Sequence, residues 1–377
     1  MSLNVEPEIL ILLCKILFVF AAAMQLFYYL FFYSRMAFYK VKVQSTVTPP
    51  VSVIIAARNE YENLSRNLPV ILEQEYPDFE VIVVNDGSWD DTSSLLEAFS
   101  NQYQNLKIVR KHENDRFDGG KKLAILLGIK AAKNERLLFT DADCRPVSQK
   151  WIERMVTNSA DDQGVVLGYS PYSKSKGLLN ALIRFDNWLT GMNYLSFAMA
   201  RMPYMGVGRN LSYSKNRFFE IGGFKRHYHL KSGDDDLFVN EAAIPETTSI
   251  CLDKDAFVET LAKKDWKSYW RQKKRHLSTS WKYKWYQKLL LAAQPLSTLI
   301  LFSTAVLLMV FHTWMYIVLG VLLVRLSLQI FIFSRSSRWL GQRDLIFFAP
   351  ILEIFVIAMS GLVHIANISA KQTSWRS

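Results

Sequence analysis

Residues 51–60 read VSVIIAARNE, a run of β-branched and small apolar residues that ends in polar and charged ones. A continuous apolar run of this length is typical of a strand buried on both faces of a parallel sheet. Similar runs follow at 79–85 (FEVIVVN), 106–110 and 136–140 (RLLFT), and helix-like segments separate them at 60–73, 91–102 and 120–132. Repeated strand–helix units of this kind predict a doubly wound α/β sheet.

The composition indicates a membrane protein with a large polar domain. Of the 377 residues, 50% are hydrophobic, and long apolar runs lie at both ends of the chain with most charges between them. This pattern excludes a fully soluble protein and an intrinsically disordered one. The net charge of +11 favours anionic partners, namely nucleic acid, nucleotide phosphates or a membrane surface. Three scattered cysteines (Cys14, Cys144 and Cys251) predict reduced thiols in a cytoplasm-facing protein.

Four apolar runs, at 9–32, 289–311, 314–333 and 345–366, are long enough to cross roughly 30 Å of hydrocarbon. Basic residues follow the first run and fill the loop between the last two. The positive-inside rule places both basic segments in the cytoplasm and Met1 outside, as in a multi-pass protein of the cell (inner or plasma) membrane. We therefore expect a transmembrane helix at 1–33, a cytoplasmic α/β domain at 34–262, an interfacial segment at 263–288 and three transmembrane helices at 289–377.

The residues suited to catalysis or ligand binding follow the carboxyl ends of the predicted strands. Ligands of open α/β sheets bind at this edge. Asp86, in the turn after the second strand, is placed to accept hydrogen bonds from a base or ribose. Ser88 and Asp90 can equally cap the next helix. Asp141 and Asp143 follow the fourth strand, and carboxylates two residues apart can share Mg2+ or Mn2+ that holds a diphosphate. The alternative is a solvated acidic turn.

A second acidic cluster, Asp234, Asp235 and Asp236, lies far along the chain. Displacement at an anomeric carbon needs neutralisation of the leaving group and a base that deprotonates the incoming hydroxyl, and two separate carboxylate groups meet both needs. The alternative is that these aspartates only supply negative charge at the start of a helix.

The chain resembles family 2 glycosyltransferases of the GT-A fold over about residues 50–280. Three motifs occur in the order and spacing seen in that family: Ala57-Arg58-Asn59-Glu60, Asn85-Asp86-Gly87-Ser88 and Asp141-Ala142-Asp143. Those enzymes use a nucleotide sugar, usually a UDP sugar, and invert the anomeric configuration. The resemblance implies that Ala57, Arg58, Glu60 and Asp86 bind the donor. It also implies that one of Lys121 and Lys122 approaches the nucleotide.

Two downstream segments extend the resemblance. Ser232–Leu237 is similar to the acidic motif that supplies the general base, and Gln272–His276 is similar to the Q-x-x-R-W motif of membrane-bound polysaccharide synthases. This implies substrate-binding roles for Gln272, Arg275 and His276. His276 replaces the family's Trp, which leaves processive polymerisation open. Alignment from the glycine makes Asp235 the base, whereas alignment from the leucine makes Asp234 the base.

Residues 263–288 contain ten Lys or Arg, one acidic residue and seven Trp or Tyr. Such a pattern can stack on nucleic acid, but directly before a membrane span it predicts an interfacial helix against anionic lipid. We therefore expect membrane lipids and no nucleic acid as partners. The apolar segment 178–199 contains Arg184 and Asp186 and is expected to be a second interfacial helix.

Together these features predict a membrane-bound inverting glycosyltransferase that moves a sugar from a nucleotide sugar to a lipid or polysaccharide acceptor. The alternatives are single-sugar transfer to a polyprenyl-phosphate carrier and a non-catalytic nucleotide-sugar sensor or scaffold. Within the predicted spans, Arg325 and Glu353 both lie eight residues from the cytoplasmic end, at a depth of ~12 Å. Because unpaired charges at that depth are costly, we expect them to form an ion pair.

Overall fold

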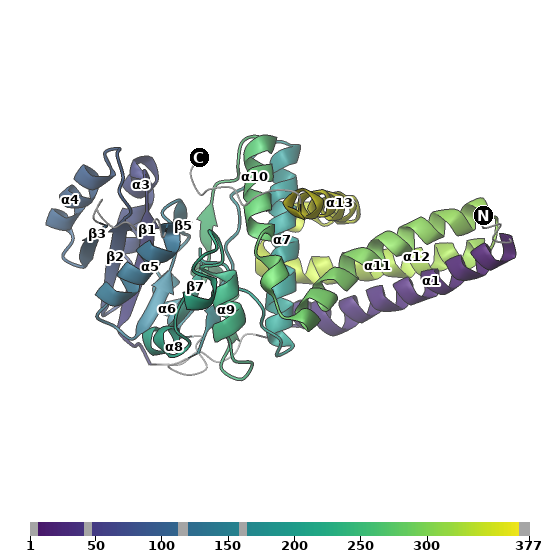
Figure 1. The fold of residues 1–377 in the computed structure, drawn as a ribbon, viewed down its shortest axis with the longest axis horizontal. Helices are drawn as coiled ribbons and strands as arrows, with labels where there is room; N and C mark the ends of the chain where they lie inside the picture. Colours follow the sequence, from purple (N-terminus) through teal and green to yellow (C-terminus); the bar gives the residue numbers. More distant parts are fainter. Residues whose placement is uncertain (1–6, 41–46, 112–119, 158–163, 369–377) are drawn as a thin grey trace.

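A computed structural model of the chain describes residues 7–40, 47–111, 120–157 and 164–368. Met1 lies outside these ranges. The described part contains a seven-stranded sheet in the order β3-β2-β1-β4-β7-β6-β8 and a two-stranded sheet of β5 and β9 (Figure 1). The strands are β1 Val51–Ala57, β2 Phe79–Asn85, β3 Leu106–Arg110, β4 Arg136–Phe139, β5 Cys144–Pro146, β6 Val166–Leu167, β7 Leu211–Ser214, β8 Ser249–Ile250 and β9 Val258–Thr260.

The first four strands form the predicted parallel half of the sheet. β1 pairs with β2 from Val51 opposite Phe79 to Ala57 opposite Asn85, and with β4 on its other side. This register brings the ends of β1, β2 and β4 to one edge. The second half is mixed, because β7 runs antiparallel to both β4 and β6. The α/β fold of the sequence prediction is thus confirmed, with a mixed rather than wholly parallel sheet.

Two hydrophobic cores cover the two faces of the sheet, as alternating side chains of a doubly buried strand require. On one face, Ile54 and Val84 pack with α5 and α7. On the other, Val53 and Val83 pack with α3, α4 and α6. These helices are α3 Tyr61–Leu72, α4 Thr92–Gln102, α5 Gly120–Ala131, α6 Trp151–Val156 and α7 Leu178–Met199. Two short helices, α8 Lys215–Glu220 and α9 Asp236–Ala242, follow β7.

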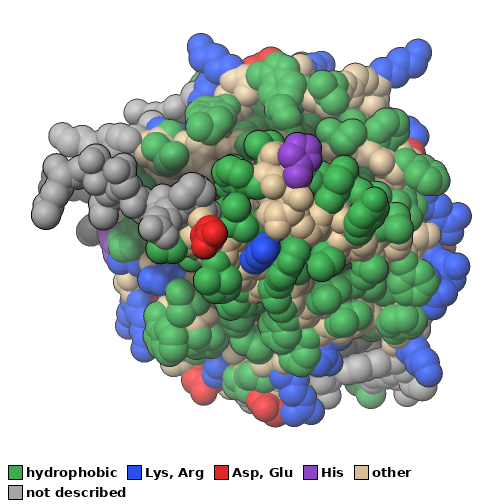
Figure 2. Space-filling model, turned by 90° about the vertical axis from the view of Figure 1, so that its right-hand side faces the viewer, with side chains coloured by type: hydrophobic (Ala, Val, Ile, Leu, Met, Phe, Trp, Pro, Cys, Tyr) green, Lys and Arg blue, Asp and Glu red, His purple; other side chains and the backbone are tan. Residues whose placement is uncertain are grey.

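Among the described residues, four helical segments are long and apolar enough to cross a membrane: Glu8–Ala37, Trp285–Val310, Met315–Leu340 and Ala349–Ile368. The first comprises α1 Pro7–Phe27, a π-helical turn at Tyr28–Tyr33 and α2 Ser34–Ala37, and the others are α11, α12 and α13. Helices α1, α11 and α12 extend away from the α/β domain as one bundle (Figure 1). Seen from the free end of this bundle, hydrophobic side chains cover the centre, and Lys and Arg lie mostly around the edge (Figure 2).

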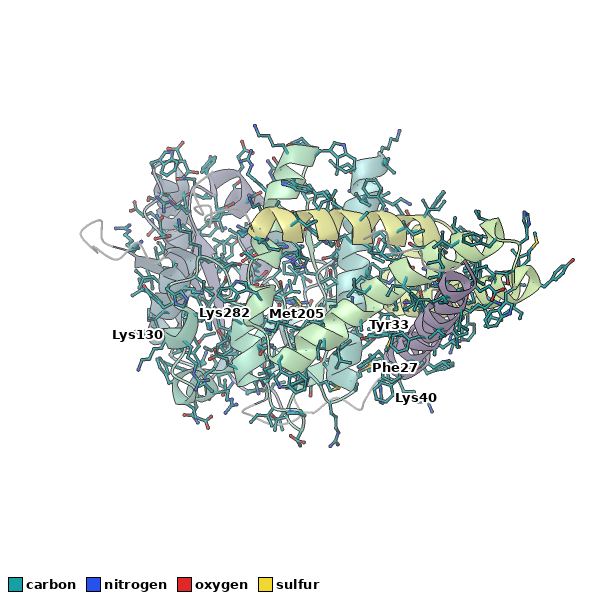
Figure 3. The ribbon with its side chains drawn as sticks, turned by 45° about the vertical axis from the view of Figure 1, so that its right-hand side comes forward. Phe27, Tyr33, Lys40, Lys130, Met205 and Lys282 are labelled. Carbon is teal, nitrogen blue, oxygen red and sulfur yellow. The ribbon has the colours of Figure 1, made fainter. Side chains whose placement is uncertain are left out.

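Helices α7 and α10 (Trp266–Leu277) lie between the α/β domain and the bundle and run across its direction (Figure 1). Helix α13 also differs in direction from α1, α11 and α12. It is seen almost along its axis in Figure 1 and at full length in Figure 3, where the bundle is foreshortened. The fourth apolar run therefore has the composition of a span, but it packs on α10 and α7 rather than parallel to the other three helices.

Candidate active site

The loops after β1 and β2 hold each other in place. Asn59 has a positive φ of 57°, and its N–H donates to Ser88 Oγ at 2.9 Å. Its side-chain oxygen accepts the N–H of Trp89 at 3.0 Å. The N–H of Asp86 donates to the carbonyl of Ala57 at 2.9 Å. The first two sequence motifs therefore form one structural unit at the carboxyl edge of the sheet.

Asp86 is buried at this edge between two cations. Lys111 Nζ lies 2.8 Å from its Oδ1, and Arg58 Nη1 lies 3.9 Å from its Oδ2. The Arg58 guanidinium also lies 5.7 Å from the ring centre of Trp89, whose side chain is 78% exposed. Sequence reasoning found Arg58 and Asp86 but missed Lys111 and Trp89, since only the pairing of β2 with β3 brings Lys111 to this loop.

Asp141, Asp143 and Cys144 each place one donor atom within 4.8 Å of the other two, at the end of β4. Burial, followed by the charges of Asp143 and Asp141, raises the pKa of the Cys144 thiol well above its usual value. The thiol therefore stays protonated, and the two carboxylates are the donors suited to a hard cation such as Mg2+ or Mn2+. Burial raises the pKa of the Glu60 carboxyl, a hydrogen bond from Asn63 at 2.6 Å opposes that rise, and the charges of Asp143 and Asp141 add to it.

Lys121, near the start of α5, joins this pair to the second acidic cluster. Its Nζ lies 2.8 Å from Asp141 Oδ1 and 3.0 Å from Asp234 Oδ2. Burial works against its charge, but Asp141 and Asp234 raise the pKa of Lys121 well above its ordinary value. Lys121, Asp141, Asp234 and Asp235 line one small pocket together with Gly208. Residues more than a hundred positions apart in the sequence thus meet at one point.

The three successive aspartates have different surroundings. Burial raises the pKa of Asp234, but Lys121 outweighs it and the pKa is lowered. Asp235 accepts the N–H of Gly208 at 2.9 Å and that of Asp236 at 2.8 Å. Burial, then Asp234 and Asp236, raise the pKa of Asp235 to about 7.

Asp236 does not line the pocket and instead bonds residues of the segment between α10 and α11. Its Oδ2 accepts hydrogen bonds from Thr279 Oγ1 and, at 2.8 Å, from the hydroxyl of Tyr283. Burial raises the pKa of this carboxyl against those bonds. Asp236 therefore anchors the segment between α10 and α11, and sequence reasoning had no signal for either partner.

Lys121 and Lys122 also differ in their contacts. The Lys122 ammonium is buried and donates to the carbonyls of His227, Leu230 and Ser232 at 2.6, 3.0 and 2.7 Å. Burial lowers the pKa of Lys122 to about 8. Of the two candidate lysines, Lys121 lies in the pocket, whereas Lys122 holds the loop that leads into the acidic cluster.

The Q-x-x-R-like motif lies on α10 at the edge of the site. Gln272 donates to the hydroxyl of Tyr172 at 3.0 Å, and the ring of Tyr172 lies 4.8 Å from the Arg209 guanidinium. Arg275 and His276 are both exposed. Desolvation, followed by the positive charges of Arg275, Arg209, Lys273 and Lys121, lowers the pKa of His276 well below its usual value, so its imidazole is neutral.

Helix α10 is tied to α7 by charge as well as by packing. Lys273 pairs with Asp186 of α7, and Tyr269 donates to the same carboxylate at 2.8 Å. On the other side of α7, Arg184 pairs with Asp344, in the loop between α12 and α13. These contacts hold the two crossing helices between the pocket and the bundle.

Comparison with known proteins agrees with this architecture. Residues 52–224 match the model for "Glycosyl transferase family 2". The chain is 33% identical over 200 residues to Glycosyltransferase AglE of Haloferax volcanii, which is 51% of this chain and 60% of that protein. It is 34% identical over 103 residues to a poly-beta-1,6-N-acetyl-D-glucosamine synthase of Staphylococcus epidermidis, or 27% of this chain and 24% of that one. In both relatives the match covers less than two thirds of the relative's length.

Among solved structures, the mannosyltransferase PcManGT of Pyrobaculum calidifontis, in complex with GDP-Man and Mn2+, is similar in fold. Its TM-score is 0.64 with 18% sequence identity, and the alignment covers 96% of this chain and 100% of the other. The likeness extends over the helices as well as the α/β domain, since so much of both chains is aligned.

Proposed function

We propose that the chain, whose residues 52–224 match the model for glycosyl transferase family 2, transfers a sugar from a nucleotide sugar to an acceptor at the cytoplasmic membrane surface. The observation that carries the proposal is the double ion pair of Lys121, which gathers Asp141 and Asp234 beside Asp235 in one pocket. Such a pocket can bind a donor diphosphate through a cation on one set of carboxylates and can deprotonate an acceptor hydroxyl with the other.

In this proposal the donor occupies the carboxyl edge of the sheet. Asp86, with Arg58 and Ala57, accepts the nucleoside, and Asp141 and Asp143 hold a divalent cation. The cation, when bound, neutralises charge on the leaving diphosphate. Family resemblance favours a UDP sugar. The PcManGT complex with GDP-Man makes GDP sugars the second candidates.

Asp235 is the proposed general base. Its pKa of about 7 lies close to physiological pH, where a base combines an ionised fraction with enough basicity to accept a proton. Attack by the deprotonated hydroxyl on the face opposite the leaving group inverts the anomeric configuration. Gln272, Arg275 and His276 lie on the membrane side of the pocket, and we assign them to the acceptor.

The test uses the purified full chain in lipid nanodiscs with Mn2+ and a panel of UDP and GDP sugars. We expect release of free nucleoside diphosphate with one donor, its stimulation by lipid or glycan extracts, and an inverted linkage in the product. Asp235→Asn should bind that donor without turnover. Donor binding by the wild type without nucleotide release, with any donor and any extract, would identify a nucleotide-sugar sensor and contradict transfer.

A further inference from the structure

Helix α13 begins beside the α/β domain. Asp344, just before the helix, pairs with Lys174 Nζ at 2.9 Å. Lys174 lies between β6 and α7 and belongs to the α/β domain. The same carboxylate pairs with Arg184 of α7, whose side chain is buried. These contacts hold the start of α13 at the end of the bundle that faces the domain.

The last turn of α13 also lies on the domain side. Asn367 donates from its side chain to the backbone carbonyl of Lys274 on α10 at 3.0 Å. Two residues earlier on α10, Gln272 donates to the hydroxyl of Tyr172 at 3.0 Å. Tyr172 precedes Lys174, the partner of the other end, by two residues. Both ends of α13 are therefore tied to the same part of the α/β domain.

A helix of this length that crossed the membrane would have its two ends on opposite sides. Helix α13 has 20 residues and is ~30 Å long, about the thickness of the hydrocarbon core. Helices α11 and α12 extend away from the domain and are joined at the free end of the bundle (Figure 1). Helix α13 instead runs across their direction and packs on α7 and α10 (Figure 3).

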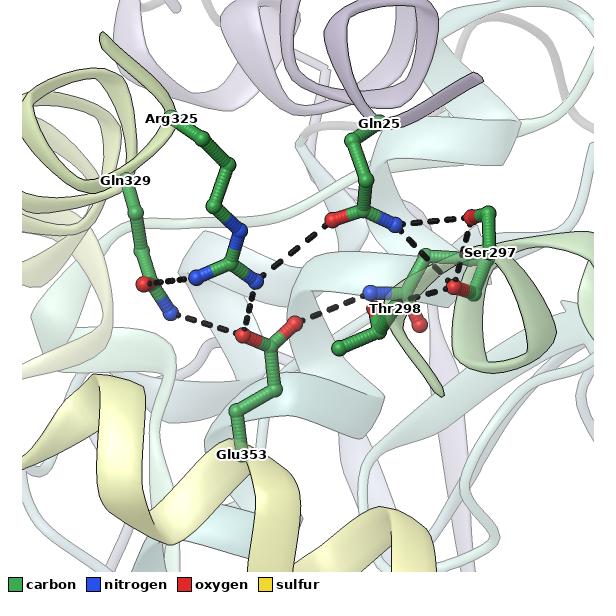
Figure 4. Close-up of polar contacts among 7 residues, drawn as sticks. Gln25, Ser297, Thr298, Arg325, Gln329 and Glu353 are labelled. Carbon is green, nitrogen blue, oxygen red and sulfur yellow. Dashed lines mark hydrogen bonds and ion pairs between the residues drawn. The ribbon is translucent and has the colours of Figure 1, made fainter. Parts of the chain in front are cut away.

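Large apolar side chains are exposed along α13. Ile351 is 72% exposed, Leu362 58% and Ile365 64%. The helix contains no Lys or Arg, and its one acidic residue, Glu353, points into the bundle, where it pairs with Arg325 (Figure 4). Exposed apolar side chains of this size are unfavourable in water and favour contact with hydrocarbon. The exposed side of α13 therefore suits the acyl chains of a membrane leaflet.

We propose that α13 does not cross the membrane but lies in the leaflet next to the α/β domain, with one side on α7 and α10 and the other against lipid acyl chains. The described chain then crosses the membrane three times, and the residues after α13 lie on the same side as the α/β domain. They include Lys371 and Arg376, which the positive-inside rule places in the cytoplasm. This arrangement replaces the fourth span expected from hydropathy and does not depend on the proposed transfer reaction.

The first test is cysteine labelling of the full chain in intact cells of an expression host. The native cysteines are buried, so the wild type gives the background. Ser374→Cys adds a thiol after α13, Lys130→Cys adds one on the surface of the α/β domain, and His312→Cys adds one between α11 and α12. A membrane-impermeant maleimide should label His312→Cys in intact cells and the other two only after permeabilisation. Labelling of Ser374→Cys together with His312→Cys in intact cells would overturn the proposal.

The second test is the depth of α13 in nanodiscs of phosphatidylethanolamine and phosphatidylglycerol, and it decides the case if Ser374→Cys labels under neither condition. Depth is measured by the collision of nitroxide labels with oxygen and with a nickel chelate. Three exposed positions on one face of α13 carry the labels: Ile351, Ala358 and Ile365. The matched exposed positions on α12 are Ile317, Val324 and Phe331.

In α12 the middle label should be the deepest, because it lies ~10 Å along the helix from each of the other two. In α13 the depth should stay level or change in one direction from Ile351 to Ile365. A maximum of depth at Ala358, like that at Val324, would show a fourth span and overturn the proposal. Asp235→Asn should give the same depths as the protein without this change, so a failure of the transfer reaction leaves both tests readable.

Discussion

The ammonium group of Lys121 lies 2.8 Å from a carboxylate oxygen of Asp141, the residue that also faces Asp143 and Cys144. The lysine therefore contacts one of the carboxylates that a divalent cation would use. It also carries the charge that keeps Asp141 and Asp234 together. The same contact thus stabilises the unliganded pocket and competes with the metal.

We predict that Lys121→Met binds Mn2+ more tightly than the wild type although its transfer activity is lower. Removing a nearby positive charge should raise the affinity at least about tenfold, or about 1.4 kcal/mol. Titration of free Mn2+ by electron paramagnetic resonance measures this. Lys130→Met, an exposed lysine of the same helix, is the control and should leave the affinity unchanged. Weaker binding by Lys121→Met would show that Lys121 does not compete for the metal carboxylate.

Asp235→Asn should lower kcat by about 100-fold or more, the usual contribution of a positioned base. Donor binding should remain, because Asp235 lies apart from Asp86 and Arg58. Asp236→Asn should instead lower the Tm, since its carboxylate accepts bonds from both Thr279 and Tyr283. Turnover assays and thermal unfolding of both variants separate the roles. If Asp234→Asn is inactive while Asp235→Asn is active, the base is Asp234.

The activity of the wild type should rise with pH through an apparent pKa near 7, the value for Asp235. Asp234 is one of the charges that raise that pKa, so in Asp234→Asn the limb of the kcat/KM profile should move to lower pH. The profile of Lys130→Met should match the wild type. A limb that stays in place in Asp234→Asn would contradict the coupling of these two carboxyls.

The same shift predicts how stability depends on pH. The folded protein holds the Asp235 proton up to about pH 7, whereas the ordinary pKa of aspartate is 3.8. The raised pKa of Asp235 therefore lowers the free energy of unfolding by its full amount above pH 7. This destabilisation disappears below about pH 4, where the carboxyl is protonated in both the folded and the unfolded state. Asp235→Asn should gain Tm relative to the wild type as pH rises from 4 to 7. A constant difference over that range would contradict the raised pKa.

Lys122→Met should lose stability rather than donor affinity. Three carbonyls of the loop at 227–232 lose a charged donor, and bonds of that kind contribute about 1.5–3 kcal/mol each. Chemical denaturation should show a loss of several kcal/mol at most and faster proteolysis of this loop. Lys130→Met again serves as the matched variant. Unchanged stability with lost donor binding would reverse the roles assigned to Lys121 and Lys122.

The parts of the fold that the sequence predicts are those set by local patterns. The apolar runs of β1 and β2 and the motifs at their ends determine the parallel half of the sheet and bring Arg58 to Asp86. The antiparallel β7 has no such local signal, because its direction depends on contacts with β4 and β6. The sequence of α13 reveals a long apolar helix but not the direction in which that helix runs. Its direction depends on packing against α10 and α7.

Roles within the site were harder to predict than its members. The three residues at 234–236 are all aspartates, so the sequence does not distinguish them. Their different contacts come from Lys121, Gly208 and Thr279, which are distant along the chain. Adjacent residues in a helix point in different directions, so Lys121 and Lys122 could be told apart only once the neighbours of α5 were known.

The ion pair of Arg325 with Glu353, predicted from equal depth in consecutive apolar runs, is confirmed, and both side chains are buried. Glu353 also accepts bonds from Gln294 at 3.0 Å and Gln329 at 2.9 Å. Arg325→Met leaves that carboxylate without its charge partner, and breaking a buried pair costs about 3–5 kcal/mol. We therefore expect a lower Tm in detergent for Arg325→Met and for Glu353→Gln, and recovery of more than half of the loss in the double variant.

Arg338→Met, at an exposed position of the same helix, is the control for the loss of an arginine and should leave the Tm unchanged. Activity per folded molecule then separates a structural clamp from a role in the acceptor path. If Glu353→Gln reduces the yield but its folded fraction transfers sugar at the wild-type rate, the pair only holds α12 to α13. A reduced transfer rate of that folded fraction would instead give the pair a role in the acceptor path. Two single variants as stable as the wild type would show that the pair contributes nothing to the bundle.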